Sequence, residues 1–221
     1  MEPTVWHSGI FSDHSIGNKQ GLATKWFGGE WEPPTHTPPP LSMDAVQPLI
    51  SYLRGKPLPR EAFPEAAYVF DGKRFAKLGD LFFARGFFVV KDRLAQVLFQ
   101  FDLGSEGLAP FPIYWEDKVT PVAGKFYLWK LGAQKSALVP GQSQKIRPFG
   151  VGLNVSKDRW ALQSDAEDGD VALSAAAAAG PPDVWSDPKL DSSLFFSDAL
   201  VAALRAAKIE TDFHLRRCRL V

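Results

Sequence analysis

The sequence DVWSDPKLDSSLFFSDALVAALRAAKIETDFHLRRCRLV, residues 183–221, has the clearest order of structural signals in the chain. Ser197 and Asp198 stand directly before four apolar residues with the i, i+3, i+4, i+7 spacing of one helix face: Leu200, Ala203, Leu204 and Ala207. A serine in this place can accept a hydrogen bond from a first-turn N–H, and an acidic residue beside it is favoured at the positive end of the helix dipole. The stretch therefore predicts a helix that begins after Ser197.

A strand is expected after this helix. The polar run 210–212 interrupts the apolar spacing, and residues 213–221 then favour an extended conformation. Arg216, Arg217 and Arg219 crowd this strand, so we expect it to have one solvated face or an edge position in a sheet.

A similar segment lies upstream. When Asp92 is aligned with Asp198, the apolar pair before the helix and the stripe along it both coincide. The matched pairs are Val89 with Phe195, Val90 with Phe196, Leu94 with Leu200, Val97 with Ala203, Leu98 with Leu204, Phe101 with Ala207 and Leu103 with Ile209. A predicted strand follows each helix, at residues 111–115 in the first case. Two similar helix-then-strand units indicate an internal duplication; the alternative is that any amphipathic helix followed by a strand would align this well.

Other elements are predicted from apolar spacing and turn residues. The dense apolar run 81–90 favours a buried strand, and residues 122–131 alternate so that they should pair with 111–115 as a hairpin. Asp71 and Gly72 predict a tight turn between short strands at 67–70 and 73–75. Val46, Leu49, Ile50 and Leu53 have helical spacing, and Pro48 among them implies that this helix either begins near Gln47 or is kinked.

The totals are those of an ordinary globular protein. With 45% hydrophobic and 23% charged residues among 221, the chain can bury a full core. We expect an α+β fold with a mixed or antiparallel sheet and short helices. Residues 1–80 are rich in Trp and Pro and residues 81–221 contain the duplicated units, and the two regions are expected to form one compact body.

Charge, cysteine content and hydropathy exclude several classes of function. Lys plus Arg equals Asp plus Glu at 25 each, so no overall field attracts nucleic acid or an anionic membrane. The single Cys218 allows neither an intramolecular disulfide nor a cysteine metal cluster. No apolar run approaches the ~20 residues of a membrane span, and no secretory leader is recognisable, so a cytoplasmic location is expected.

An acidic cluster, Asp165, Glu167, Asp168 and Asp170, is the sharpest concentration of charge in the chain. Its glycine, Gly169, falls fifth from Asp165, where a calcium loop would need it sixth. Two interpretations stay open. The cluster is either a solvated acidic turn or an anionic patch that faces a basic surface of a partner protein.

No catalytic constellation is visible. The four histidines, His7, His14, His36 and His214, are scattered, and the glycines at 150 and 152 lack the third glycine of a dinucleotide fingerprint. His214 and Cys218 lie at i and i+4 on a predicted strand, roughly 13 Å apart, so they cannot form a dyad. We therefore expect no enzyme activity, no metal and no cofactor.

The C-terminal residues resemble a known family. DVWSDPKL at 183–190 and LFFSDAL at 194–200, followed by a short helix and a final strand, are similar to the C-terminal signature of immunity proteins of bacterial polymorphic toxin systems. The match is to the family numbered eleven, formerly a domain of unknown function. It is weaker over residues 87–131, where VKDRL at 90–94 and GKFYL at 124–128 fit the same type, and it does not extend to the first eighty residues.

The resemblance implies a protein that binds and neutralises a toxin encoded by an adjacent gene, by occluding its active site or functional surface. A cognate toxin is then the expected partner, with no nucleic acid and no membrane, and the acidic cluster is the candidate contact. Two alternatives remain open. One is an enzyme of unknown, hydrolase-like reaction, and the other is a carbohydrate or peptide binding module that uses Trp6, Trp26 and Trp31.

Overall fold

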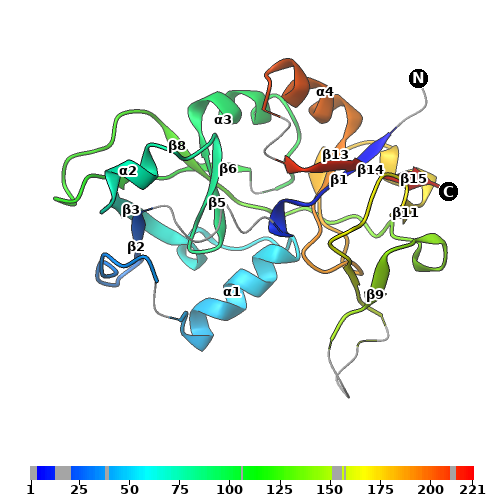
Figure 1. The fold of residues 1–221 in the computed structure, drawn as a ribbon, viewed down its shortest axis with the longest axis horizontal. Helices are drawn as coiled ribbons and strands as arrows, with labels where there is room; N and C mark the ends of the chain where they lie inside the picture. Colours follow the sequence, from blue (N-terminus) through cyan, green and yellow to red (C-terminus); the bar gives the residue numbers. More distant parts are fainter. Residues whose placement is uncertain are drawn as a thin grey trace.

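The chain folds as α+β, with short strands in several mostly antiparallel sheets and short helices around them (Figure 1). The computed structural model describes residues 4–12, 21–37, 40–105, 107–150, 156, 158–209 and 213–221, with the side chains of residues 43–45 left out. The predicted fold class is confirmed.

One four-stranded sheet contains the first of the two similar units. Its strands lie in the order β4 (Leu81–Ala84), β5 (Phe87–Lys91), β8 (Phe126–Trp129) and β6 (Leu108–Pro110), and each neighbouring pair is antiparallel. Helix α3 (Asp92–Leu98) connects β5 to β6. Because β8 lies antiparallel between them, β5 and β6 are parallel, and β5–α3–β6 is a split βαβ unit.

A second four-stranded sheet repeats this plan. Its order is β12 (Val184–Trp185), β13 (Phe195–Ser197), β1 (Val5–Ser8) and β14 (Leu215–Arg217), again with antiparallel neighbours. Helix α4 (Asp198–Ala206) connects β13 to β14. The two sheets differ in where the central strand lies along the chain. In the first sheet the central strand, β8, comes after the strand–helix–strand unit, and in the second sheet the central strand, β1, comes before it.

The strand register also agrees between the two sheets. Val90 pairs with Tyr127, which pairs in turn with Pro110. Phe196, the aligned counterpart of Val90, pairs with Trp6, which pairs with Arg217. The two helix-then-strand units predicted from the sequence are therefore present, but the strand of the first unit is β6 at residues 108–110 and not the expected 111–115.

Smaller sheets complete the fold. Strands β2 (Leu22–Trp26) and β3 (Pro64–Val69) are antiparallel, and β7 (Ile113–Tyr114) joins β3 in parallel. Two pairs remain: antiparallel β9 (Ile146–Pro148) with β10 (Trp160–Leu162), and parallel β11 (Ala172–Leu173) with β15 (Arg219–Leu220). Within the described ranges, the other helices are α1 (Met43–Leu53), α2 (Gly72–Phe75) and the 3-10 turns η1 (Ile10–Ser12), η2 (Arg60–Ala62), η3 (Pro140–Gln142) and η5 (Ala175–Ala178).

A large aromatic core joins the two units. Trp129 on β8 lies edge-on to Phe196 and Phe213, with ring centroids 6.4 and 6.2 Å apart. Helices α3 and α4 lie side by side over this core (Figure 1), and Arg93 of α3 donates a hydrogen bond to the carbonyl of Ala207. A smaller buried cluster covers the other face of the second sheet and includes Val5, Trp185, Phe195 and Cys218.

The predicted start of α4 is confirmed. Ser197 Oγ accepts a hydrogen bond of 3.2 Å from the Leu200 N–H, and it donates one of 2.6 Å to Asp183. Leu200 and Leu204 are fully buried, as the spacing indicated. Lys91 stands in the equivalent place before α3 and makes no side-chain cap.

Several predicted boundaries were wrong. The apolar run 81–90 is a hairpin, because Arg85 and Gly86 adopt positive φ angles of 54° and 91° and reverse the chain between β4 and β5. Asp71 does not form a hairpin turn; its side chain accepts from the Arg74 N–H at 3.1 Å and caps α2. Helix α1 begins at Met43, so Pro48 lies in its interior.

The predicted hairpin between 111–115 and 122–131 forms only in part: Tyr114 and Pro121 form an antiparallel bridge, and the Val122 N–H donates to the Ile113 carbonyl at 2.8 Å. Strand β8 pairs with β6, whose residues 108–110 precede the expected strand 111–115. Strand β7 belongs to a different sheet, in which it pairs with β3. The strand predicted over 213–221 is divided at Cys218 into β14 and β15, which belong to different sheets.

Candidate functional site

A cavity of about 660 Å³ opens on the second sheet. Its walls come from β1 and η1, from β14 and the residue before it, from β10 and the segment after it, and from the loop at residues 191–192. These segments are far apart in the chain and meet only because β1 lies between β13 and β14. The cavity is thus a product of the second split unit.

His7 and Arg216 are direct neighbours across this sheet. They are paired residues on β1 and β14, so their side chains lie on the same face. His7 is only 4% exposed, and its ring lies edge-on to Phe195 with centroids 5.2 Å apart. Its Nδ1 is buried with no hydrogen-bond partner. Burial, with a smaller contribution from the charge of Arg216, lowers the pKa of His7 to about 4, so the ring is neutral at pH 7.

Arg216 is half-buried, and no described residue forms an ion pair or hydrogen bond with its guanidinium. The guanidinium lies over Gly9, where an added Cβ would stand 3.1 Å from Nη1. Among the described residues that line the cavity, Asp191 carries the single carboxylate, and this carboxylate pairs with Arg159. Arg216 therefore has no carboxylate partner in direct contact among the described residues.

The hydroxyl of Ser8, the residue after His7, forms structural hydrogen bonds to the backbone. Ser8 Oγ donates to the Phe213 carbonyl at 2.6 Å and accepts from the Ile10 N–H at 3.2 Å. Successive residues of a strand point to opposite faces, so Ser8 and His7 do not form a nucleophile and base pair. His214, which precedes β14 with a φ of 49°, is exposed and lines the cavity.

The acidic cluster forms one loop between β10 and β11, close to β14. Asp165 forms an exposed ion pair of 2.6 Å with Lys145, whose hydrogen bond lowers the pKa of this carboxyl. Asp168 accepts from the Arg217 N–H at 2.8 Å, and Asp170 accepts from the Glu167 N–H at 2.7 Å. The structure thus brings the four residues together, and it uses two of them to shape the loop and attach it to β14.

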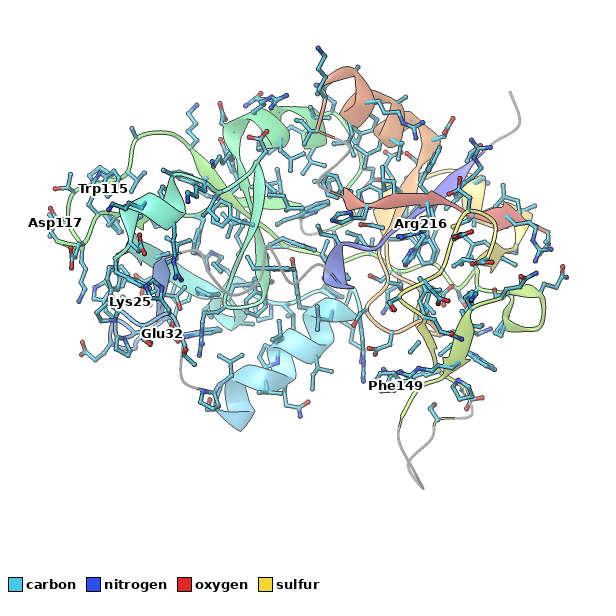
Figure 2. All side chains as sticks on the ribbon, viewed as in Figure 1. Lys25, Glu32, Trp115, Asp117, Phe149 and Arg216 are labelled. Carbon is cyan, nitrogen blue, oxygen red and sulfur yellow. The ribbon has the colours of Figure 1, made fainter. Side chains whose placement is uncertain are left out.

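A second hollow, of about 550 Å³, runs along β6, β7 and β8. Its walls are apolar and rich in proline, with Pro110, Phe111, Pro112, Pro121 and Val122 among them. Large apolar side chains stand exposed near it: Phe99 at 52%, Trp115 at 42% and Val119 at 76%. Phe99 lies edge-on to Tyr127 of the groove, with centroids 5.4 Å apart. We call this surface the aromatic groove. Figure 2 shows Trp115 and Asp117 at the opposite end of the molecule from Arg216.

The aromatic residues near the start of the chain do not form one exposed platform. Trp6 is 6% exposed, donates to Asp198 at 2.9 Å, and lies under the guanidinium groups of Arg205 and Arg217. Trp26 and Trp31 are half-buried on other elements.

The remaining candidate residues are dispersed. His14 lies outside the described residues, and His36 is exposed, 3.6 Å from Asp71. Cys218 is buried in the smaller core cluster. In the described part of the chain, no three or more His, Cys, Asp or Glu side chains are grouped so as to bind a metal ion.

Sequence reasoning missed both hollows. The cavity depends on the pairing of β1 with β14, for which the chain has no local signal. The aromatic groove had a weak signal, since Trp115 and Val119 interrupt an otherwise polar segment. None of the helices in the described residues combines the length and apolar character required to cross a bilayer.

No protein-family model and no curated protein matches the chain. The resemblance over residues 183–221 therefore depends on the quoted sequence signature alone.

Proposed function

We propose that this chain is an immunity-type protein, which binds a protein toxin and neutralises it by covering the toxin's active site or functional surface. The sequence signature of residues 183–221 supports this function. The structural observation that carries it is the aromatic groove, a surface suited to the centre of a protein interface.

The aromatic groove has the features of such a centre. Protein interfaces are enriched in aromatic residues, and a few of them in well-packed pockets provide most of the binding free energy. Phe99 and Trp115 are about half-exposed although each has a large apolar area, and they flank a hollow with apolar walls. Large exposed apolar side chains beside an apolar hollow support an interaction site here.

The acidic loop is a second candidate contact. Glu167 and Asp168 are exposed, and a toxin that acts on nucleic acid would present a basic surface to them. Lys145 offsets one of the carboxylates by pairing with Asp165. We expect this loop to act mainly on the rate of association, because exposed charges at the rim of an interface steer the encounter.

The function is tested with the toxin encoded by the adjacent gene. The two proteins should associate when purified, and co-expression should remove the toxicity. Trp115→Ala and Phe99→Ala should each weaken binding by about 30-fold if these rings are central contacts, which corresponds to ~2 kcal/mol. Phe27→Ala is the matched control, because Phe27 is a similarly exposed aromatic that does not line the groove.

The acidic loop is tested by Glu167→Lys, since this residue contributes its backbone N–H to the hydrogen bond with Asp170 and its carboxylate is exposed. We expect slower association and a weaker dependence on salt. Failure of the toxin to bind, with full toxicity on co-expression, would refute the proposed function.

A further inference from the structure

We infer that the cavity between β1, β14 and the segment after β10 is a binding site for a small organic anion, with its carboxylate or phosphate group held by Arg216. This site is separate from the aromatic groove and goes beyond toxin binding.

The first reason is the state of Arg216. A half-buried guanidinium loses part of its hydration, and this cost is normally offset by a carboxylate or by hydrogen bonds. The other cations close to the cavity follow that rule, since Arg159 pairs with Asp191 and Lys145 with Asp165. Arg217 has its guanidinium over the ring of Trp6, on the opposite face of the sheet. Arg216 alone of these four faces the cavity without a partner among the described residues.

The second reason is the neighbouring histidine. His7 lines the cavity, is almost completely buried, and has a ring nitrogen without a partner. A neutral imidazole can donate one hydrogen bond and accept another. An unsatisfied buried polar atom next to an unpaired cation is the arrangement expected of a binding site without its ligand.

The third reason is the size and the walls of the cavity. A volume of about 660 Å³ falls within the range of ~300–1,000 Å³ that is typical of small-molecule sites. Phe11 and Leu162 provide apolar walls, and Gln163 and Ser192 add polar groups near them. Gly9 leaves room beneath the guanidinium, because a side chain there would contact Nη1. The ligand is thus an anion with an apolar body.

Arg216 suits both carboxylate and phosphate, because its planar fork of N–H groups matches either oxyanion. The two are separated by experiment. The purified full-length protein is titrated by calorimetry with phenyl phosphate, with benzoate, and with neutral benzyl alcohol. We expect saturable 1:1 binding of at least one of the two anions, and binding of the neutral compound that is about tenfold weaker or undetectable, because a hydrogen bond to a charged group is worth ~1.5–3 kcal/mol.

Arg216→Gln should weaken binding of the preferred anion by about tenfold or more. Arg217→Gln is the matched control, since it removes a neighbouring arginine whose guanidinium lies on the other face, and it should leave binding unchanged. As a readout that needs no variant, the anion should shift the ring resonances of His7 and His214 in NMR spectra. Equal binding of the neutral compound, equal binding by Arg216→Gln, or no saturable binding of either anion would overturn the inference.

Discussion

Burial of His7 makes the stability of the protein depend on pH between about 4 and 6.5. In the unfolded chain this histidine has its ordinary pKa of 6.5, and in the folded protein the value falls to about 4. Within this interval the unfolded chain binds a proton that the folded protein excludes. The free energy of unfolding therefore decreases as the pH falls from 6.5, and the loss is nearly complete at about pH 4.

The magnitude follows from the size of the pKa shift. One pKa unit corresponds to ~1.4 kcal/mol, so a shift from 6.5 to about 4 lowers the free energy of unfolding by roughly 3 kcal/mol at the acidic end. The titratable and charged residues that line the same cavity are Arg216 from β14, His214 before that strand, and Asp191, which is paired with Arg159. Burial is the larger cause and Arg216 the smaller one, so most of the effect should remain if the arginine is replaced.

Urea unfolding between pH 4 and 8 measures this effect when wild type is compared with His7→Phe. The phenylalanine keeps a flat ring against Phe195 but cannot bind a proton. The carboxylates titrate in both proteins, so the difference between the two curves isolates His7. We expect the variant to gain about 3 kcal/mol relative to wild type as the pH falls from 7.5 to 4. For Val5→Ala, a control on the same strand, the free energy of unfolding should depend on pH in the same way as in wild type. Parallel curves for wild type and His7→Phe would refute the reasoning.

Three further predictions concern the second split unit. Leu204→Ala should lower the free energy of unfolding by roughly 2–5 kcal/mol, because this side chain is fully buried under α4; Ala202→Ser on the exposed side of the same helix should change it by less than about 0.5 kcal/mol. Ser197→Ala should cost about 1–2 kcal/mol in thermal unfolding, since both the cap to Leu200 and the bond to Asp183 are lost. Cys218 should react with maleimide only at the rate at which the protein opens, because burial raises the pKa of its thiol; rapid labelling of the native protein would contradict this.

The elements that could be predicted from the sequence are those with local signals. Ser197, the apolar stripe of α4 and its copy in α3 are encoded within about ten residues each, so spacing and capping locate them. The run 81–90 was predicted as a single strand because both strands of its hairpin are apolar on both faces. No alternation of polar and apolar residues therefore marks the turn at Arg85. Asp71 misled because the same side chain is suited to a tight turn and to a helix cap.

The candidate sites depend on contacts that no local pattern contains. The acidic loop could be located from composition, but its attachment to the Arg217 N–H could not. Likewise, His7 was only one of several scattered histidines until β1 was placed beside β14. Residues that come together from the two ends of the described chain give no periodicity to detect, so a cavity between them is visible only in three dimensions.

The insertion of β1 between β13 and β14 has a consequence for biosynthesis. Trp6 and its hydrogen-bond partner Asp198 are 192 positions apart, so β1 leaves the ribosome long before the strands that flank it exist. At ~5–20 residues per second the delay is on the order of ten seconds or more, during which the first sheet can already assemble. For that interval β1 has two unpaired edges that are accessible to chaperones and to other nascent chains, and the synthesis of β14 ends this exposure.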